Sequence, residues 1–171
     1  GPQIEILADK GDSNRYELPK PILNKGGCNL SFAGLKTAIL KISKNLKSEK
    51  EKFDLAASFQ KTIETILCEK TKIAFMEFKK INKNKNNTFV IAGGVAANKG
   101  IRNTLNNLSK KNSFETIFPN ISLCSDNAAM IAMVGLEKYN LGIFDNIDFK
   151  TNPRWALDEK AKFLKGAGVK L

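Results

Sequence analysis

The stretch TFVIAGGVAANKGIRNTL, Thr88 to Leu105, decides the fold of this chain. Its first five residues, 88–92, form a short apolar run that stops at Gly93 and Gly94, which predicts a buried strand ending in a tight turn. Asn98 then stands at an N-cap position, and apolar residues follow at helical spacing (Ile101, Leu105 and Leu108). The predicted unit is therefore strand, glycine turn, helix.

This turn has two interpretations. Gly93 and Gly94 let the backbone come close to a ligand, and the start of the next helix offers unpaired N–H groups to an anion or a polar edge. The spacing matches neither G-x-G-x-x-G nor the P-loop pattern, so those two phosphate motifs are absent. Taken alone, the stretch is either a plain strand-to-helix turn or a nucleotide loop.

Length and composition predict one domain, or one lobe of a larger protein, over residues 1–171. The 171 residues, 42% of them hydrophobic, are enough for one core and few for two. No apolar run approaches the roughly 18 residues of a membrane span, and the N-terminus lacks a signal-peptide layout. We expect a soluble, cytosolic protein that does not contact a membrane.

The three cysteines are Cys28, Cys68 and Cys124, an odd number without a C-x-x-C pair, so we expect reduced, mostly buried thiols. The formal net charge of +11 invites an RNA partner. However, only three of the 28 basic residues are arginine, and this uniform lysine excess is more typical of compositional drift than of a selected phosphate clamp.

The region before the central stretch is predicted to be mainly helical. A short helix over 3–10 should begin with Pro2 at its first position, and residues 15–21 should form an edge strand limited by prolines. Residues 24–29 are expected to be loop. Residues 30–37 should pass from a strand-like start, with Ser31 as a cap, into a helix. Residues 49–81 predict one long helix or a kinked pair, with a broad apolar face turned to the core.

Behind the central stretch, residues 114–118 predict a second strand, and residues 128–139 an apolar helix that ends at Gly142. Asp126 precedes this helix, which is so hydrophobic that we expect the helix to be largely buried. On position alone, Asp126 is either an N-cap carboxylate or a ligand facing the cleft of Gly93 and Gly94. The tail, with Trp155, is expected to be irregular. Two successive strand-then-helix units predict an α/β lobe with some parallel pairing.

Five ordered blocks together resemble the tRNA N6-adenosine threonylcarbamoyltransferase (TsaD) family. They are GPQIE, LSFAGLKT, VIAGGVAANKGIR, LCSDNAAMIA and NPRWAL, beginning at residues 1, 30, 90, 123 and 152. The resemblance implies a lobe of the actin, Hsp70 and sugar-kinase fold, corresponding to the C-terminal part of a two-lobed transferase. It also implies transfer of the threonylcarbamoyl group from threonylcarbamoyl-AMP to N6 of the adenosine 3′ of the anticodon, in tRNAs that read ANN codons.

By the same resemblance, Gly1 and Glu5 match positions that hold the nucleoside, Glu5 through ribose hydroxyls. Asn98 matches a further nucleotide-binding position beside Gly93 and Gly94, and Asp126 matches a metal-binding aspartate. With the resemblance, the cleft interpretation of Asn98 and Asp126 is favoured over capping. The implied partners are tRNA and the accessory threonylcarbamoylation proteins of bacteria, and the implied ligand is threonylcarbamoyl-AMP or another adenine nucleotide.

The sequence departs from the family at the metal. The family holds one divalent metal, iron or zinc, with a pair of histidines and this aspartate, whereas the present chain contains no histidine. A lone carboxylate does not define a transition-metal site. We therefore expect a truncated lobe that retains metal poorly, carries no catalytic residue of its own and turns over little.

Two other interpretations stay open at this stage. One is the lobe of another kinase of the actin-like superfamily, although the DNAAMIA block speaks against it. The other is a non-catalytic remnant that binds a partner or RNA. Gly1 and Pro2 are themselves ambiguous, because they are either native residues or the scar of a protease site.

Overall fold

The computed structural model describes residues 1–82 and 86–151. Contacts divide the chain into two compact units, Gly1–Asn127 and a second that begins at Ala128. Trp155 and the rest of the predicted irregular tail beyond residue 151 lie outside the described residues.

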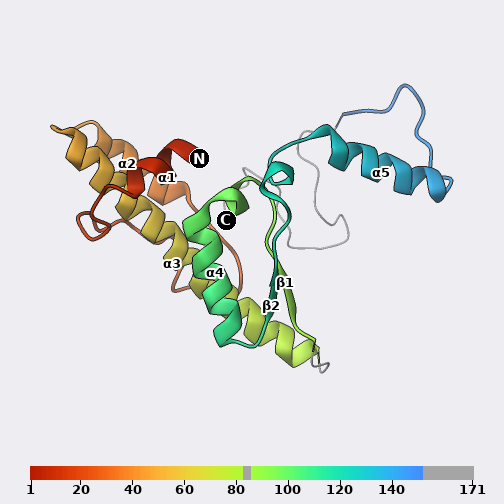
Figure 1. The fold of residues 1–171 in the computed structure, drawn as a ribbon, viewed down its shortest axis with the longest axis horizontal. Coiled ribbons are helices and arrows are strands. Elements are labelled where there is room, and N and C mark those ends of the chain that lie inside the picture. The colour runs from red at the N-terminus through yellow and green to blue at the C-terminus, as the bar shows by residue number, and fades with distance from the viewer. Residues whose placement is uncertain (83–85, 152–171) are drawn as a thin grey trace. The chain divides into compact units, whose positions relative to one another are not determined.

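The first unit is built on a single long helix, α3 (Glu49–Ile81), which runs unbroken for 33 residues (Figure 1). Ser48 caps its start by accepting a hydrogen bond from the Glu51 backbone N–H at 3.2 Å, and the Glu51 carboxylate accepts one from Lys47 N at 2.6 Å. This reciprocal arrangement satisfies N–H groups that a helix start leaves open. The prediction of a helix over 49–81 is confirmed, in its unkinked form.

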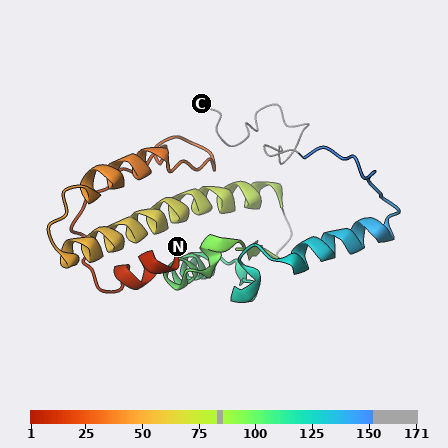
Figure 2. The same cartoon turned by 90° about the horizontal axis from the view of Figure 1, so that it is seen from above.

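Three shorter helices pack along α3 (Figure 2). Helix α2 (Ala33–Ser43) lies on one side, and α1 (Pro2–Ala8) and α4 (Lys99–Lys111) lie on the other. Two apolar clusters fill the spaces between them, one on the side of α2 and one on the side of α4. The first is Leu18, Leu35, Leu55 and Ile66, and the second is Phe75, Ile101, Leu105, Leu108 and Phe114.

Two short strands complete this unit. Strand β1 (Thr88–Val90) pairs in parallel with β2 (Glu115–Ile117), with Phe89 opposite Thr116, and α4 connects them. Two short 3-10 helices, η1 (Gly94–Ala97) and η2 (Ile121–Leu123), follow the strands. The predicted α/β class with parallel pairing is confirmed.

The first predicted strand is shorter and less buried than expected. It ends at Val90, which is 59% exposed, and only Phe89 points toward the core. Because α4 covers one face of a two-stranded sheet, alternate side chains face solvent.

The predicted edge strand over 15–21 is wrong, because these residues form no ladder in the described part of the chain. Their backbone is instead held by side chains of α3. Tyr16 N donates to Ser58 Oγ at 3.1 Å, and Asp12 N, a little earlier, donates to Asp54 Oδ1 at 2.7 Å. With Pro19 and Pro21 lacking N–H donors, this segment packs as extended chain around buried Leu18.

The strand-like start and the Ser31 cap expected before α2 are also absent. The N-cap residue is Phe32, and no side chain caps this helix. The helix itself is nevertheless present as predicted, with Leu35 buried and Ile39 and Ile42 packed against the same cluster.

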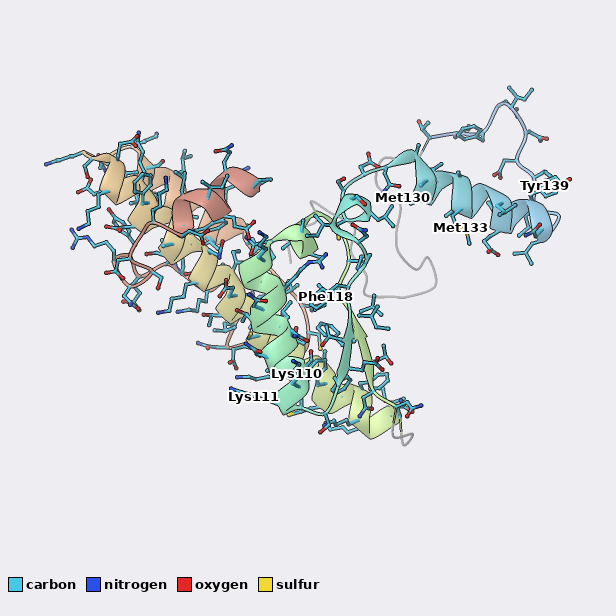
Figure 3. All side chains as sticks on the ribbon, in the orientation of Figure 1. Lys110, Lys111, Phe118, Met130, Met133 and Tyr139 are labelled. Atoms are coloured by element: carbon cyan, nitrogen blue, oxygen red, sulfur yellow. The ribbon has the colours of Figure 1, made fainter. Side chains whose placement is uncertain are left out.

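The second unit contains α5 (Ala128–Asn140), which is helical as predicted and ends before Gly142. Gly142 has a φ of 67° and its N–H donates to Tyr139 O at 3.0 Å, a left-handed C-terminal turn that glycine allows. The expected burial is wrong, since none of the described residues of α5 is buried. Figure 3 labels Met130, Met133 and Tyr139 on this helix, and they are 49%, 55% and 68% exposed.

Two further properties bear on the sequence predictions. Cys124 is buried, but Cys68 is half-buried and Cys28 is exposed, so the expectation of mostly buried thiols holds only in part. In the described residues, no helix combines the length and apolar character that crossing a membrane requires.

Candidate functional site

A cavity of about 690 Å³ lies within the first unit, beside the start of α4. Helix α1, the middle of α3 and the turn between β1 and α4 each supply part of its wall. Its polar or small lining residues are Gly1, Glu5, Gln60, Gly94, Asn98, Lys99 and Ser125, and its apolar ones include Ile4, Phe59, Ile63 and Ile121. This volume suits a small-molecule ligand.

Four of the six residues singled out in the sequence meet at this cavity, namely Gly1, Glu5, Gly94 and Asn98. They come from positions almost a hundred residues apart. Gly93 is outside the lining but shapes the turn, since its φ of 88° is readily adopted only by glycine. Asp126 is also outside the lining, although its neighbour Ser125 contributes to it.

Asn98 caps α4 as the sequence predicts. Its Oδ1 accepts a hydrogen bond from Ile101 N at 2.9 Å, and its Nδ2 donates to Gln60 Oε1 at 3.0 Å. The side chain is therefore fixed at both ends, from its own helix and from α3. The Asn98 side chain therefore both caps α4 and lines the cavity.

Glu5 reaches α4 from the other end of the sequence. Its Oε1 accepts a hydrogen bond from Lys99 N at 2.7 Å. A carboxylate at a helix N-terminus is stabilised by the helix dipole and by the N–H it satisfies. Together with the Asn98 cap, this reduces the number of free donors expected at the helix start, because Lys99 N and Ile101 N are both occupied by side chains.

Arg102 stabilises the wall of the cavity through contacts to two of the segments that form it. Its guanidinium donates to Ala96 O, to Pro119 O at 3.1 Å and to Cys124 Sγ at 3.2 Å, and lies 4.8 Å from the centre of the Phe118 ring. These contacts join the glycine turn to the segment that carries Ile121 and Ser125. Arginine suits this position because its planar fork of donors can serve several acceptors at once.

Among the described residues, Asp126 belongs to no cluster of potential metal ligands. Its side chain is exposed, as is the helix that follows it, and in residues 1–82 and 86–151 no three His, Cys, Asp or Glu side chains come together as metal ligands. Asp126 also lies one residue too early for the N-cap position, since α5 begins at Ala128 and the residue directly before it is Asn127. An isolated carboxylate does not fit an iron or zinc ion.

Sequence reasoning missed Gln60, Lys99 and Ser125 as lining residues. Gln60 had a weak signal, since it is a polar residue between Phe59 and Ile63 on the apolar face of α3. Ser125 and Lys99 flank residues that were noticed, but their types alone indicate no ligand.

Comparison with known proteins gives one consistent result. Residues 1–133 match the family described as TsaD, tRNA N6-adenosine threonylcarbamoyltransferase. The chain is 69% identical over 171 residues to the tRNA N6-adenosine threonylcarbamoyltransferase of Pelagibacter ubique (strain HTCC1062), covering all of this chain and 48% of the relative.

It is also 46% identical over 161 residues to the protein of the same name from Rickettsia bellii (strain OSU 85-389), covering 93% of this chain and 47% of the relative. A protein of that name from Rickettsia massiliae (strain Mtu5) is 46% identical over 162 residues, covering 93% and 47% of the two chains. The chain therefore spans about half the length of the relatives it matches.

Proposed function

Since the chain belongs to the tRNA N6-adenosine threonylcarbamoyltransferase family, we propose that its cavity binds the adenylate of threonylcarbamoyl-AMP during modification of tRNA. The observation that carries this proposal is the meeting of Gly1, Glu5, Gly94 and Asn98 around one cavity of nucleotide size.

The proposed reaction is an acyl transfer. The N6 amine of the adenosine 3′ of the anticodon, in tRNAs that read ANN codons, attacks the carbamoyl carbon of the mixed anhydride. A C–N bond forms, the bond from that carbon to the phosphate oxygen breaks, AMP leaves and the amine loses one proton. Nothing among the described residues is assigned as acid, base or nucleophile.

The residues of this chain bind and orient the nucleotide. Gly94 adds no side chain to the wall, and a Cβ built there would meet nothing within 4 Å, so a ligand can approach the backbone closely. Glu5 uses Oε1 for Lys99 N, and we assign its other oxygen to the ribose hydroxyls. Asn98, held from two sides, presents a preset amide to the nucleoside.

The proposal assigns no divalent metal, iron or zinc, to the described residues of this chain. Asp126 alone does not fit it, so no step of the reaction is derived through a metal. For the same reason, and because the relatives are about twice as long, we expect the chain alone to turn over little.

The proposal includes the fold and the partners. We assign the parallel pair β1–β2, with its crossing helix α4, to one lobe of the actin-like fold. We assign residues 1–171 as a whole to the C-terminal part of a two-lobed transferase. The proposed partners are tRNA and the accessory threonylcarbamoylation proteins, in the cytoplasm.

Calorimetric titration with AMP tests the cavity. Asn98→Ala should weaken AMP binding, but it also removes a cap worth about 1 kcal/mol of stability. Asn98→Ser keeps a capping oxygen and removes only the amide, so it should bind AMP as weakly as Asn98→Ala while unfolding close to the parent temperature. Asn107→Ala, on the exposed side of α4, is the control. Unchanged affinity in Asn98→Ser would contradict the assignment.

The transfer itself is tested by mixing the chain with the remaining half of the Pelagibacter relative, threonylcarbamoyl-AMP and a tRNA that reads an ANN codon. Mass spectrometry of the digested tRNA should detect threonylcarbamoyladenosine with both halves and none with either half alone. Failure of the reconstituted pair, each half being folded, would count against the transferase proposal.

A further inference from the structure

A line of polar side chains connects α4 to α3 behind the cavity. Asn98 Nδ2 donates to Gln60 Oε1 at 3.0 Å, and Gln60 Nε2 donates to Glu64 Oε1 at 3.2 Å. The other oxygen of Glu64 accepts a hydrogen bond from Thr104 Oγ1 at 3.1 Å. Starting from Ile101 N, which donates to Asn98 Oδ1, each group donates to the next, and the line ends on a carboxylate.

The polarity of this line is fixed at both ends. A backbone N–H can only donate, and an ionised carboxylate can only accept. Asn98 must therefore turn its oxygen to α4 and its amine to Gln60, and Gln60 must turn its oxygen to Asn98 and its amine to Glu64. Amide groups in such a chain polarise one another in the same sense.

The spacing of the two helices is set for these contacts by Gly100. A Cβ at Gly100 would lie 2.5 Å from Gln60 Nε2, 2.8 Å from Glu64 Oε1 and 3.3 Å from Asn98 Oδ1. Any larger residue would displace the side-chain ends of Gln60 and Glu64, which form one hydrogen bond of the line. The glycine is thus explained by the close approach of the polar side chains, not by its backbone angles.

Two of the polar side chains of the line reach the cavity. Gln60 and Asn98 line it, whereas Glu64 does not. Glu64 is joined to the cavity wall through its hydrogen bond with the Gln60 amide, so we expect its influence on a ligand to pass through the orientation of that amide.

We propose that Gln60 and Glu64 are positioning residues that hold the Asn98 amide in one orientation toward the nucleotide. This inference rests on the proposed function, since it concerns the same cavity. It adds that nucleotide affinity depends on an acceptor at position 60 and on a side chain at position 64, one helical turn further along α3 and outside the cavity, that hydrogen-bonds to that acceptor's side chain and orients it.

AMP titration of the full chain, with circular dichroism and thermal unfolding for each variant, tests the inference. Gln60→Met and Glu64→Met keep side-chain length and remove the polar groups. Each should lower AMP affinity about fivefold to tenfold, which corresponds to the loss of roughly one hydrogen bond. Glu69→Met, on the same helix but paired with exposed Lys72, is the matched control and should bind as the parent does.

An exchange of the two side chains gives a sharper readout. Gln60→Glu alone places two carboxylates side by side and should lower the unfolding temperature. In the double variant Gln60→Glu with Glu64→Gln, the carboxylate at position 60 again accepts from Asn98 Nδ2. The amide at position 64 donates to that same carboxylate. It should regain the parent unfolding temperature and bind AMP within about twofold of the parent.

The outcomes separate the two proposals. If the parent chain bound no AMP, the proposed nucleotide site would fail, and the positioning role with it. If the parent bound AMP and Glu64→Met bound equally well, only the positioning role would be overturned. A folded double variant that binds AMP at least fivefold more weakly than the parent would overturn it as well, and this outcome does not depend on whether Gln60→Met folds.

Discussion

At the residue scale, several side chains have roles that their chemical type alone does not indicate. Lys70, a residue type that is rarely inside a protein, is 3% exposed, and its ammonium donates to the carbonyls of Lys25 at 2.7 Å and Gly27 at 3.2 Å. It thereby ties the loop before α2 to the centre of α3. Asp54 and Ser58 hold the chain around residues 12–16 in the same way, so α3 organises the loops through its polar side chains as well as its apolar face.

Gly11 gives a prediction about close packing. A Cβ at Gly11 would run into the carbonyl group of Phe53 on α3, whereas one at Gly26 would meet nothing within 4 Å. Gly11→Ala should therefore lower the free energy of unfolding by about 2 kcal/mol, in the range of overpacked sites, and Gly26→Ala should leave it nearly unchanged. Urea unfolding of the two variants checks this, and equal effects would show that the loop yields easily.

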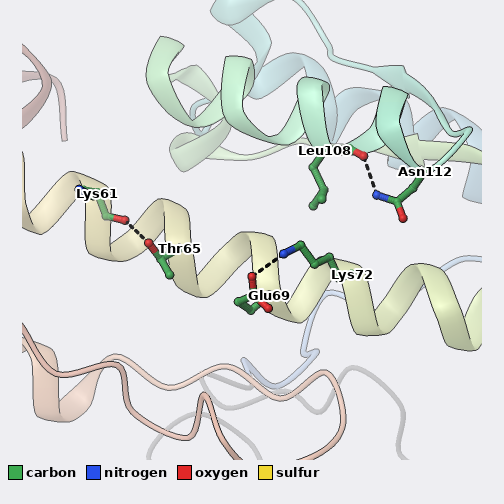
Figure 4. Close-up of polar contacts among 6 residues, drawn as sticks. All are labelled: Lys61, Thr65, Glu69, Lys72, Leu108 and Asn112. Atoms are coloured by element: carbon green, nitrogen blue, oxygen red, sulfur yellow. Dashed lines mark hydrogen bonds and ion pairs between the residues drawn. The ribbon is translucent and has the colours of Figure 1, made fainter.

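Cys68 gives a prediction about pH. Burial raises the pKa of its thiol, and Glu64 and Glu69 add to the increase, while Lys72 opposes it; Figure 4 shows the Glu69–Lys72 pair. At about pH 8, iodoacetamide should alkylate exposed Cys28 well before Cys68, because the thiolate is the reactive form. Peptide mass spectrometry follows the order, and equal rates at the two sites would contradict it.

The same shift has a consequence for stability. The folded chain holds the Cys68 proton more tightly than the unfolded chain does, so this contribution is complete below the pKa of the unfolded thiol. It is lost as pH rises through the higher pKa of the folded thiol. As pH rises from neutral to alkaline, the free energy of unfolding should therefore fall less in Cys68→Ala than in the parent.

At the scale of elements, the helices and the turn after β1 were predictable, because each carries a local signal. Asn98 is a good cap, and apolar residues recur at helical spacing in α3 and α4. The false edge strand over 15–21 and the buried state expected for α5 depended on neighbours instead. A segment becomes a strand only beside a partner, and an apolar helix is buried only where another element covers it.

The candidate site was predictable to a similar degree. Gly1, Glu5, Gly94 and Asn98 were found through resemblance to a family, and the fold brings them together. Gln60 and Glu64 were not found, because a glutamine and a glutamate on a helix ordinarily face solvent. Their significance arises from the approach of α4 at Gly100, a contact between residues some forty positions apart.

Phe75 gives the prediction at this scale. Its ring stacks on Phe114 with centroids 3.8 Å apart and meets Phe89 edge-on at 5.0 Å, so it joins α3 to the sheet. Phe75→Ala should cost about 3–5 kcal/mol of unfolding free energy. Phe78→Ala, one turn further and 39% exposed, should cost clearly less. Denaturant unfolding measures both, and similar losses would mean that the sheet is not anchored through Phe75.

At the scale of the whole molecule, the formal net charge of +11 concerns the proposed tRNA partner. Lysines are spread over α2, α3 and α4 in the part of the chain that the structure describes. Examples are Lys41 on α2, Lys44 directly after α2, and Lys110 and Lys111 at the end of α4, the last two labelled in Figure 3. Spread charge attracts any RNA through counterion release and gives no fixed register on it.

Two charge reversals test whether the lysines act together or as a local clamp. The pairs Lys41→Glu with Lys44→Glu and Lys110→Glu with Lys111→Glu each reduce the net charge of +11 by four units, and all four side chains are exposed. If charge acts only through its sum, both variants should lose the same share of RNA affinity in filter binding. Both should also show a shallower dependence on salt between about 50 and 200 mM than the parent chain. A much larger loss for one pair would instead locate an RNA-binding surface on that helix, and its preference for tRNA over an unrelated RNA of equal length would then show whether that surface serves the transferase.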